Sequence, residues 1–575
     1  LGLDITTLPL YYGLTEAAWK HWARVWDVEY EWLQAQFDEV PAKGGRKART
    51  RKENMETPGI TSTRWFDAVL LPEDQIDQSN VIRGMVVFGH GGNTVTRIPD
   101  AVRGLEKLDL LVVADPHPTS YASMSERKDN TYLLPICTNF ETDGSRTASN
   151  RSLQWGEQIV KPIFESKDDY EALYLLAKKL GLADRMFKKI KVTNNRPDPE
   201  DLLREINLGG WSTGYCGQSP ERLKAHMRNQ GKFDLVTLRA PKDDPEVGGD
   251  YYGLPWPCWG KPEIRHPGSH VLYNTSLHVK DGGGTFRARF GTERNGETLL
   301  SEGSFSEGSV LTDGYPEFTM GVFKKLGWDK DLTPEEVAVI ARIGGNNVDA
   351  VSWATDLSGG IQRVCLDKGV SPYGNGKARV VAWNLPDPVP THREPIYSPR
   401  PDLVAKYPTR PDERQFRLPN IGFSVQKAAV EKNIVRDFPI VLTSGRLVEY
   451  EGGGEETRSN RWLAELQQDM FVEVNTADAA ERGIKDGQWV WVLGAENRAK
   501  TRVKALVTDR VAKGVAFMPF HFAGWYQGAD RRANYPEGTD PIVLGESVNT
   551  VTTYGFDPVT NMQETKCTLC QIQAA

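Results

Sequence analysis

The sequence predicts an α/β protein with an additional β domain, and three observations support this prediction. Between residues 60 and 194, continuous apolar runs alternate with helical patterns, which is typical of parallel strands joined by crossover helices. Residues 195–430 are rich in Gly, Pro, Trp and charged side chains, which indicates an irregular insertion and linker. From 431 to 575 many short strand patterns surround one short helix, which favours a closed β-barrel. Because 575 residues exceed what one core can hold, we expect several domains.

Residues 1–59 predict a helical segment. Its tryptophans Trp19, Trp22, Trp26 and Trp32 recur near helical spacing and indicate a core or an interface. The basic run G-G-R-K-A-R-T-R-K that follows predicts a solvated loop, with contact to acidic groups as the alternative. The chain starts L-G-L-D-I-T-T-L-P-L, without an initiator Met or a signal-peptide pattern. We therefore expect this segment to continue a missing N-terminal region.

The region 60–194 has a clear order of elements. We expect strands at 81–88 (V-I-R-G-M-V-V-F), 108–115 (L-D-L-L-V-V-A-D) and 131–136 (T-Y-L-L-P-I). Helices are expected in A-V-R-G-L-E-K-L and in an amphipathic stretch at 168–181 that ends at a glycine. This order predicts a Rossmann-like parallel sheet with helices on both faces. Ligands bind such sheets at the carboxyl ends of the strands, where Gly89 to Asn93 and Asp115 fall.

The insertion and the C-terminal region differ in pattern. The Pro-rich stretch N-L-P-D-P-V-P-T-H-R-E-P-I-Y-S-P-R-P-D predicts an extended linker, and we assign no chemistry to residues 195–430. In the region 431–575, the strand I-V-L-T-S-G-R is followed by a strand, a short helix and a further strand. The alternating run R-V-K-A-L-V-T-D-R-V and then G-V-A-F-M-P-F-H-F add two more strands.

Composition and charge exclude several functions. With 70 basic and 77 acidic residues the net charge is −7, so bulk charge gives no argument for nucleic-acid binding. No segment approaches about 18 uninterrupted apolar residues, so the sequence predicts no transmembrane helix. Among the six cysteines only Cys567 and Cys570 are closely paired, and without a second pair they read as small residues of a C-terminal strand. The turn G-H-G-G-N-T is not a G-x-G-x-x-G, so NAD binding is not predicted.

Two glycine turns at strand ends carry the functional signal. Glycines let backbone N–H groups approach an anionic or polar heterocyclic ligand, since no side chain intervenes. The turn Thr443-Ser444-Gly445-Arg446 adds a guanidinium that can bind phosphate with two hydrogen bonds. Asp115, at another strand end, suits the paired donors of a ribose or a guanine edge. Each turn alone is a weak signal, because most glycine turns after strands are structural.

The order of segments resembles the molybdenum- or tungsten-dependent formate dehydrogenases of the dimethyl-sulfoxide-reductase superfamily. In particular it is similar to the C-terminal portion of their catalytic (alpha) subunit, over roughly residues 60–190 and 435–575. The resemblance rests on G-M-V-V-F-G-H-G-G-N, L-L-V-V-A-D-P-H-P-T, Y-L-L-P-I-C-T-N-F-E-T-D-G-S, T-S-G-R-L-V-E-Y and F-V-E-V-N-T-A-D-A-A-E-R-G-I-K-D-G. It also rests on M-P-F-H-F and on V-N-T-V-T-T-Y-G-F-D-P-V-T-N-M-Q-E-T-K.

The resemblance implies a bis-molybdopterin guanine dinucleotide cofactor held between α/β domains and a six-stranded, double-psi-type β-barrel. One dinucleotide is expected on the first sheet and the other at the barrel. The implied residues are Gly89, His90, Gly91, Asn93, Asp115, Thr119, Glu141 and Asp143 on the sheet, and Thr443, Gly445, Arg446, Glu449, His521, Asn549, Gln563 and Lys566 at the barrel. Arg446 and Lys566 would neutralise pyrophosphate, and Asn549 and Gln563 would offer amides to the pterin or guanine. His521 would donate near the pterin, with a satisfied core histidine as the alternative.

The activity implied by the resemblance is the reversible oxidation of formate to carbon dioxide, with two electrons passing from a molybdenum or tungsten centre to iron–sulfur clusters. The family's [4Fe–4S] cysteines and its catalytic Cys or selenocysteine, His and Arg have no counterpart in this sequence. They are expected in the missing N-terminal part, so no catalytic or metal-ligating residue is assigned. The expected partner is an iron–sulfur electron-transfer subunit, with flavin- and NAD-linked chemistry as one form of it.

Alternatives remain at this point. Another molybdopterin oxidoreductase, such as a nitrate or polysulfide reductase, would carry similar turns, although N-R-S-L-Q-W and Q-E-T-K favour formate. A non-catalytic scaffold subunit of the same fold is the second alternative, and the presence of Arg446 and Asn549 argues against it. The scarcity of paired cysteines favours the cytoplasm, with the periplasm left open. The sequence does not distinguish molybdenum from tungsten.

Overall fold

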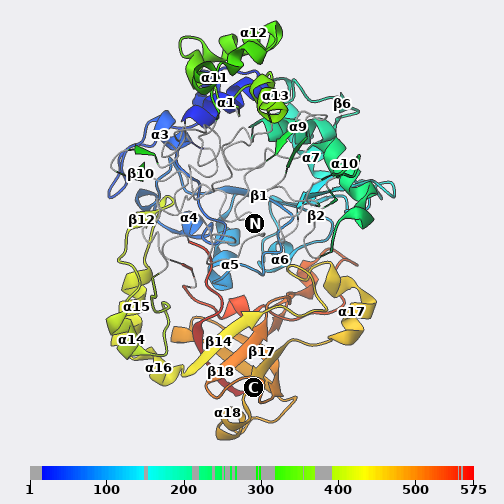
Figure 1. Cartoon of the computed structure of the whole chain (residues 1–575). Helices are drawn as coiled ribbons and strands as arrows, with labels where there is room; N and C mark the ends of the chain where they lie inside the picture. The colour runs from blue at the N-terminus through cyan, green and yellow to red at the C-terminus, as the bar shows by residue number, and fades with distance from the viewer. Residues whose placement is uncertain are drawn as a thin grey trace.

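The protein is described by a computed structural model, in which the N-terminal sheet, an irregular helical part and the C-terminal barrel follow one another along the chain (Figure 1). The structure describes residues 14, 16–147, 153–209, 219–235, 240, 241, 243–248, 252, 318–353, 355–368, 391–554, 556, 557 and 561–575. It also describes the backbone of four short strands, β8 (Trp259–Lys261), β9 (His266–Gly268), β10 (Glu293–Arg294) and β11 (Glu297–Thr298).

The N-terminal segment is helical, as the sequence predicts, with α1 (Glu16–Trp26), α2 (Tyr30–Ala35) and α3 (Arg51–Met55). Trp19, Trp26 and Trp32 pack around a small core in this segment, which confirms their structural role. Most of the basic run is exposed, as expected of a solvated loop, and Arg46 is the exception. Arg46 is buried and donates to the backbone carbonyl of Gln78 at 2.7 Å, and it also approaches the carboxylate of Glu73. The alternative, contact with acidic groups, holds for Arg46 and for Arg49, which pairs with Asp77.

The predicted parallel sheet is confirmed, with strands β1 (Gly84–Phe88), β2 (Leu110–Asp115) and β3 (Thr131–Pro135) in the order β1-β2-β3. The helices of this region are α4 (Asp67–Leu70), α5 (Ile98–Lys107), α6 (Ser120–Ser123), α7 (Asp169–Lys179) and α8 (Ala183–Met186). A hairpin of β4 (Gly144–Thr147) and β5 (Leu153–Gly156) and the short pair β6 (Val192–Thr193) and β7 (Arg196–Pro197) follow the sheet.

Only one face of this sheet is covered by the described elements. On that face Leu111 and Val113 are buried against α4, α5 and the segment around Tyr121. On the opposite face Val86 and Tyr132 are 47% and 54% exposed. The sequence-based expectation of helices on both faces therefore does not hold in the described part of the chain. It failed because continuous apolar strands predict two covered faces without saying what covers them.

The region 195–430 is more helical than the sequence predicts. It contains α9 (Pro199–Gly209), α10 (Pro220–Arg228), α14 (Pro401–Lys406) and α15 (Gly422–Glu431), the short pair β12 (Arg414–Gln415) and β13 (Leu418–Pro419), and a compact unit of α11 (Met320–Leu326), α12 (Pro334–Gly344) and α13 (Gly360–Asp367). This unit has a core of its own around Phe323 and Ile361 and lies at the end of the molecule opposite the barrel (Figure 1).

The stretch predicted as an extended linker is partly packed. Within its described residues, Ile396 and Tyr397 are buried in a cluster that also contains Leu569 of the barrel. Further on, the guanidinium of Arg417 donates to Asn54 Oδ1 at 2.6 Å, so this part of the chain joins the N-terminal helices to the rest of the fold.

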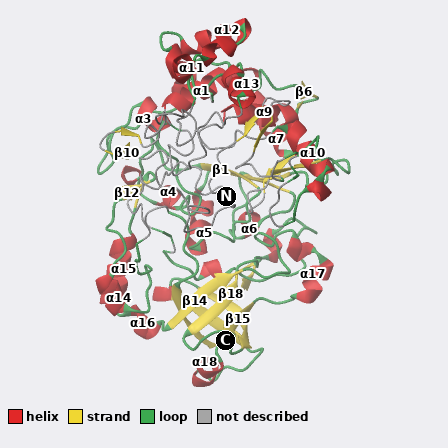
Figure 2. Cartoon of the chain, in the orientation of Figure 1, coloured by secondary structure: helices red, strands yellow, loops and turns green. Residues whose placement is uncertain are grey.

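The C-terminal region forms a closed six-stranded barrel, which confirms the prediction (Figure 2). Its strands are β14 (Ile440–Gly445), β15 (Phe471–Val474), β16 (Trp489–Gly494), β17 (Lys500–Val507), β18 (Val515–Pro519) and β21 (Thr568–Ala574), in the order β14-β18-β15-β17-β16-β21. Burial alternates along β14 and β16, as expected when every second side chain fills the barrel interior. The remaining elements here are α16 (Ile434–Asp437), α17 (Arg461–Leu466), α18 (Thr476–Glu481), β19 (Trp525–Tyr526) and β20 (Ala529–Asp530).

The cysteine pair near the C-terminus has a structural place. Cys570 is buried on β21 and Cys567 lies just before that strand. Within the described ranges, no group of three or more His, Cys, Asp or Glu side chains could hold a metal ion. None of the described helices is both long and apolar enough to cross a membrane.

Candidate functional site

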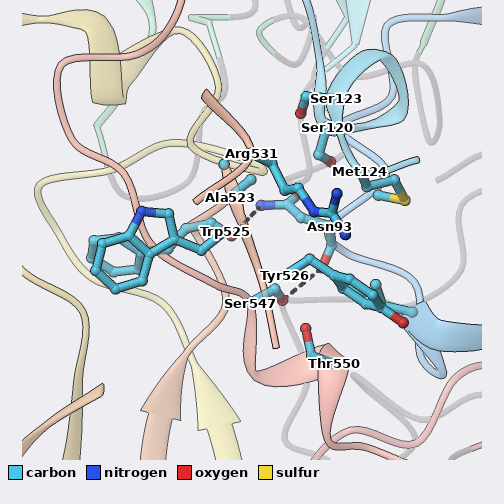
Figure 3. Close-up of a pocket in the computed structure, with 13 residues that line it drawn as sticks. Asn93, Ser120, Ser123, Met124, Ala523, Trp525, Tyr526, Arg531, Ser547 and Thr550 are labelled. Atoms are coloured by element: carbon cyan, nitrogen blue, oxygen red, sulfur yellow. Dashed lines mark hydrogen bonds between the residues drawn. The ribbon is translucent and has the colours of Figure 1, made fainter. Parts of the chain in front are cut away.

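The turn after strand β1 meets the barrel through one side chain, that of Asn93. Its amide nitrogen donates to the backbone carbonyls of Gly453 at 2.7 Å and Phe520 at 3.1 Å. In return, Ser547 Oγ and Asn549 Nδ2 donate to the backbone carbonyl of Asn93 at 2.8 Å and 3.0 Å. Figure 3 shows Asn93 between the α/β region and the C-terminal segments. The predicted turn of the sheet and the predicted barrel residues therefore share one junction.

A small cavity of about 20 Å³ lies beside Asn93, enough for about one water molecule. Ser120, Trp525 and Arg531 are among the residues that line it (Figure 3). It is a gap within the junction, too small for a cofactor.

A buried ion pair supports this junction from the barrel side. The guanidinium of Arg458 is fully buried and donates to Glu455 Oε2 at 2.5 Å. The other oxygen of Glu455 accepts from the backbone N–H of Ser120 at 3.1 Å, at the start of α6. The Ser120 hydroxyl donates to the backbone carbonyl of Gly91. A carboxylate from the barrel loop is thus fixed against the glycine turn of the sheet.

The glycines of the loop 452–454 are needed for close contact between protein segments. A Cβ at Gly453 would lie 2.9 Å from Asn93 Oδ1, and one at Gly454 would lie 2.4 Å from the backbone oxygen of His521. Gly454 also has φ +84°, a conformation that L side chains rarely adopt. At least two of the three glycines therefore let the loop pack against the junction, whichever ligand binds there.

Several buried polar atoms around the junction have no hydrogen-bond partner among the described residues, and four of them are side-chain oxygens of residues predicted to bind the cofactor. These four are Asn93 Oδ1, Thr119 Oγ1, Asn549 Oδ1 and Gln563 Oε1. The amide nitrogen of Gln563 donates to the backbone carbonyl of Thr94 at 2.6 Å, so this side chain borders the same turn. Buried polar groups are nearly always paired, because an unpaired one costs about 1–3 kcal/mol. A ligand with several hydrogen-bonding groups would satisfy such a set.

The two predicted histidines are both held by backbone N–H donors. His521 Nε2 accepts from the backbone N–H of Leu447 at 3.0 Å, and burial lowers the pKa of His521 to about 4. His90 Nδ1 accepts from the backbone N–H of Gly92 at 3.1 Å, and burial also lowers its pKa. Both rings are therefore neutral at pH 7. At His521 the nitrogen able to donate is Nδ1.

Asp115 lies at the end of β2, where the sequence analysis expects it. Its side chain is buried, and the backbone N–H of His117 donates to Oδ1 at 3.3 Å. Burial raises the pKa of Asp115 to about 7, with the neighbouring carboxylates of Glu455 and Glu456 adding to the effect. A hydrogen-bond donor or cation placed against this carboxyl group would stabilise its charged form.

Charged residues that follow strand β14 line an open groove on the barrel. Arg446 and Glu449 line an open groove of about 610 Å³, together with Lys504 and Arg510. The guanidinium of Arg446 lies 5.7 Å from the centre of the Phe520 ring. The backbone carbonyl of Phe520 accepts a hydrogen bond from the side-chain amide of Asn93, so the groove and the junction are connected through this residue.

The predicted residues next to this turn lie on or beside β14. Thr443 and Gly445 belong to the strand, and Lys566 donates from its ammonium group to the backbone carbonyl of Ser444. A Cβ at Gly445 would lie 2.6 Å from the ring of Phe517. Gly89 has φ +60° and open space beside it.

Two predicted residues have structural partners away from the junction. The oxygens of Glu141 accept from the backbone N–H groups of Thr138 and Ile163, both at 2.7 Å, and the first of these is the main reason its pKa is lowered. Asp143 pairs with the guanidinium of Arg196. Their role in cofactor binding stays a prediction.

The residues that sequence reasoning missed are the ones that connect the two parts. Ser120, Glu455, Arg458 and Ser547 carry no motif of their own. The three-residue spacing of Glu455 and Arg458 is a signal for an ion pair, but nothing in the sequence shows that the pair is buried.

The comparisons with known proteins match the two parts of this site. The family model "Molybdopterin oxidoreductase" matches residues 12–179, and the model "Molydopterin dinucleotide binding domain" matches residues 440–569. The chain belongs to the molybdopterin oxidoreductases. All the sheet residues predicted to bind the cofactor lie in the first range, and all the barrel residues lie in the second.

Relatives of this molybdopterin oxidoreductase include formate dehydrogenase alpha subunits. "Formate dehydrogenase 2 subunit alpha (cytochrome c-553)" of Nitratidesulfovibrio vulgaris is 25% identical over 536 residues, which cover 86% of this chain and 46% of that protein. "F420-dependent formate dehydrogenase 2 subunit alpha" of Methanococcus maripaludis is 30% identical over 149 residues, 26% of this chain and 18% of that protein. The chain thus spans about half the length of the first relative. The solved acetylene hydratase from Pelobacter acetylenicus aligns at 14% identity with a TM-score of 0.44, over 100% of this chain and 52% of that one.

The hydrogen-bonding groups of the junction suit a molybdopterin dinucleotide, while the cavity between them has room for only about one water molecule. The unpaired oxygens of its predicted residues are three amide oxygens, which accept, and one hydroxyl, which can donate or accept. Pterin and guanine rings carry several N–H donors and ring acceptors, and the pyrophosphate between them is anionic. The buried side chains and the nearby cations Arg446 and Lys566 match these requirements.

Proposed function

We propose that this chain is part of the catalytic subunit of a molybdenum- or tungsten-dependent formate dehydrogenase. The reaction is HCOO⁻ → CO₂ + H⁺ + 2 e⁻, run in either direction. The names and identities of the relatives from Nitratidesulfovibrio vulgaris and Methanococcus maripaludis support formate as the substrate. The bound cofactor, a bis-molybdopterin guanine dinucleotide complex of molybdenum or tungsten, would supply the two-electron chemistry.

The observation that carries the proposal is the set of four unpaired buried atoms at one junction. Two of them, Asn93 Oδ1 and Thr119 Oγ1, come from the sheet, and two, Asn549 Oδ1 and Gln563 Oε1, come from the segments after β18. Hydrogen-bonding groups of a ligand that entered between the two segments would give these atoms partners. This favours a cofactor held jointly by the sheet and the barrel.

Within this proposal each residue has a role that follows from its chemistry. The amide oxygens of Asn93, Asn549 and Gln563 would accept from N–H groups of the pterin or guanine. Arg446 and Lys566 would neutralise pyrophosphate charge. Because His521 is neutral and its Nε2 accepts from Leu447, its Nδ1–H would orient the ring system without adding charge.

A carboxylate has a separate part in binding. Asp115 would accept hydrogen bonds from ribose hydroxyls or from the guanine edge. These donors would lower its raised pKa and so keep the carboxylate ionised. Gly89 and Gly91 would leave room beside it for backbone contacts. Glu141 and Asp143 would support the loop on which they lie.

The partners follow from the reaction. Two electrons must leave the cofactor, so we propose transfer through a [4Fe–4S] cluster to an iron–sulfur electron-transfer subunit. The residues that bind formate, the metal and the cluster are not assigned to any position of this sequence.

The test is removal of the guanidinium of Arg446, which lines the groove beside β14. Arg446→Ala should lower the cofactor content of the purified native complex, because a charge-assisted hydrogen bond contributes about 1.5–3 kcal/mol, or about 10- to 150-fold in affinity. The readouts are molybdenum or tungsten by elemental analysis and released guanine nucleotide by chromatography, both per polypeptide. Arg436→Ala is the matched control, since Arg436 is also exposed but pairs with Asp437 outside the groove. Full cofactor content in Arg446→Ala would contradict the role of this turn.

A further inference from the structure

The C-terminal segment that carries two of the predicted binding residues has little regular structure of its own. We call residues 547–563 the amide segment, after the side-chain amides of Asn549 and Gln563. Among its described residues the only helix or strand is one short helical turn around Asn549. Both amides donate to backbone carbonyls of the sheet turn, Asn549 to Asn93 at 3.0 Å and Gln563 to Thr94 at 2.6 Å. The positions of their unpaired oxygens therefore depend on what holds the amide segment against this turn.

The guanidinium of Arg97 contacts the amide segment from the sheet side. Arg97 is buried at the start of α5, and it donates to Asp100 Oδ2 at 2.7 Å and to Asp67 Oδ2 at 3.0 Å. The same guanidinium lies 4.4 Å from the centre of the Tyr554 ring. From the barrel, the guanidinium of Arg498 lies 4.7 Å from that ring centre. Because a cation is attracted to an aromatic ring, Tyr554 ties the amide segment to both parts of the fold.

A second guanidinium, that of Arg64, contacts the amide segment further along. Arg64 is fully buried, and it donates to Asp67 Oδ2 at 2.8 Å and to Asn561 Oδ1 at 3.2 Å. Its guanidinium also lies 4.7 Å from the centre of the Phe556 ring. Thr63 Oγ1 donates to the backbone carbonyl of Asn561 at 2.8 Å. Arg64 therefore holds the part of the amide segment that leads directly into the second amide.

One carboxylate fixes both guanidinium groups. Asp67 Oδ2 accepts from Arg64 and from Arg97, and Asp100 completes a buried set of two cations and two carboxylates. Such a set is strongly destabilised when one member is removed, because a buried charge then lacks its partner. The other hydrogen bonds of the two guanidinium groups go to Asn561 and to the backbone carbonyl of Pro419. Neither of these acceptors is one of the four unpaired oxygens, so the network acts on the site through the amide segment.

We propose that Arg97 and Arg64 are positioning residues for the cofactor, since they hold the amide segment so that Asn549 and Gln563 face the ligand. This inference rests on the proposed function, because it requires a dinucleotide at the junction. Groups that bind a ligand do so best when packing and further hydrogen bonds fix them in place. If the amide segment is loosened, each amide forfeits a hydrogen bond to the cofactor. The expected loss is about 5- to 30-fold in affinity.

The test compares cofactor retention in native complexes that each carry one substitution. Arg97→Lys and Arg64→Lys keep the charge but lose the planar group that pairs with carboxylates and lies beside a ring. Arg46→Lys is the matched control, since Arg46 is also buried and donates to the backbone carbonyl of Gln78, away from the amide segment. The readouts are guanine nucleotide released over time, per polypeptide, and hydrogen exchange of peptides from residues 547–554.

Both test variants should release nucleotide about 5- to 30-fold faster than the unsubstituted complex, because losses of affinity appear mainly in the dissociation rate. Exchange in the amide segment should also be faster in both. Arg46→Lys should match the unsubstituted complex in both readouts. Equal acceleration in Arg46→Lys would show that general destabilisation causes the loss, and this would overturn the positioning role.

A pair of substitutions at Tyr554 tests the same contact without disturbing the buried ion pairs. Tyr554→Leu removes the ring beside Arg97 and should also release nucleotide faster, whereas Tyr554→Phe keeps the ring and should stay close to the unsubstituted complex. This pair decides if Arg97→Lys or Arg64→Lys lowers the yield of the chain. Unchanged retention in Tyr554→Leu would overturn the positioning role and leave the proposed function standing. An unsubstituted complex that holds no guanine nucleotide would overturn the proposed function, and this proposal with it.

Discussion

Removal of the Arg458 guanidinium should destabilise the junction between sheet and barrel. Arg458 is fully buried, and its side chain donates to Glu455 and also to the backbone carbonyls of Ala523 at 3.0 Å and Val543 at 3.2 Å. In Arg458→Met the apolar stem is kept, but the carboxylate of Glu455 and both carbonyls lose their donor. Breaking a buried ion pair by removing one partner costs about 3–5 kcal/mol, and we expect a loss of unfolding free energy in this range.

Proton binding limits that loss. Burial already raises the pKa of Glu455 against the lowering effect of Arg458. Without the guanidinium the carboxyl group should take up a proton more readily, so the cost of the substitution should shrink from pH 8 to pH 5. The double variant Arg458→Met, Glu455→Gln should recover part of the loss, because no charge is then buried alone.

The assay is urea denaturation of the native protein followed by tryptophan fluorescence and circular dichroism at pH 5 and pH 8. Arg436→Met is the control, since Arg436 is exposed and its ion pair with Asp437 should contribute less than about 1 kcal/mol. A loss below about 1 kcal/mol in Arg458→Met would refute the reasoning. A double variant less stable than Arg458→Met would also do so.

Three further predictions concern the barrel and its junction. Burial raises the pKa of Glu546 from its usual 4.5 to about 7 in the folded protein. As the pH rises from 4.5 to 7, the unfolded chain loses this proton while the folded protein keeps it, so the contribution of Glu546 to the free energy of unfolding should fall by about 3 kcal/mol. Glu546→Gln should flatten that part of a stability–pH curve, and an unchanged slope would contradict it. Gly445→Ala should cost about 1–3 kcal/mol in thermal unfolding, because its Cβ would lie 2.6 Å from the Phe517 ring, whereas Gly231→Ala, with open space, should stay within about 0.5 kcal/mol. Asn93→Asp replaces an amide that donates to two backbone carbonyls by a carboxylate, which can only accept. It should lower the free energy of unfolding by about 2–3 kcal/mol in urea denaturation, and an unchanged stability would contradict the role of Asn93 in joining sheet and barrel.

Much of the fold could be predicted because its signals are local. The strands β1, β2 and β3 are continuous apolar runs, and the turn Thr443-Ser444-Gly445-Arg446 ends β14 as expected. The barrel followed from several short alternating strands, whose period of two is visible in the sequence itself. Glycine turns at strand ends also pointed to the edge of the sheet that meets the barrel segments.

The links between distant segments could not be predicted. Asn93 donates to residues about 360 and 427 positions away, and no pattern in one sequence encodes such contacts. The glycines at 453 and 454 let two protein segments approach each other, and nothing in the sequence shows which segments these are. The helical unit at 318–368 was missed because its short helices lie in a Gly- and Trp-rich region, where local patterns favour loops.

The sheet face that the described elements leave uncovered shows a further limit of sequence reasoning. Val86 and Tyr132 belong to strands whose apolar character predicts burial on both sides. The sequence gives the requirement for a cover, and only the structure reveals that the described elements leave one face without it.

The most direct test of the cofactor site is the metal and nucleotide content of the purified native complex. Elemental analysis for molybdenum and tungsten should give close to one equivalent of one metal per copy of this polypeptide, with about two guanine nucleotides released on denaturation. Absence of both metals and of guanine nucleotide from an intact, fully assembled complex would contradict the account. The junction would then be a structural contact in a scaffold subunit.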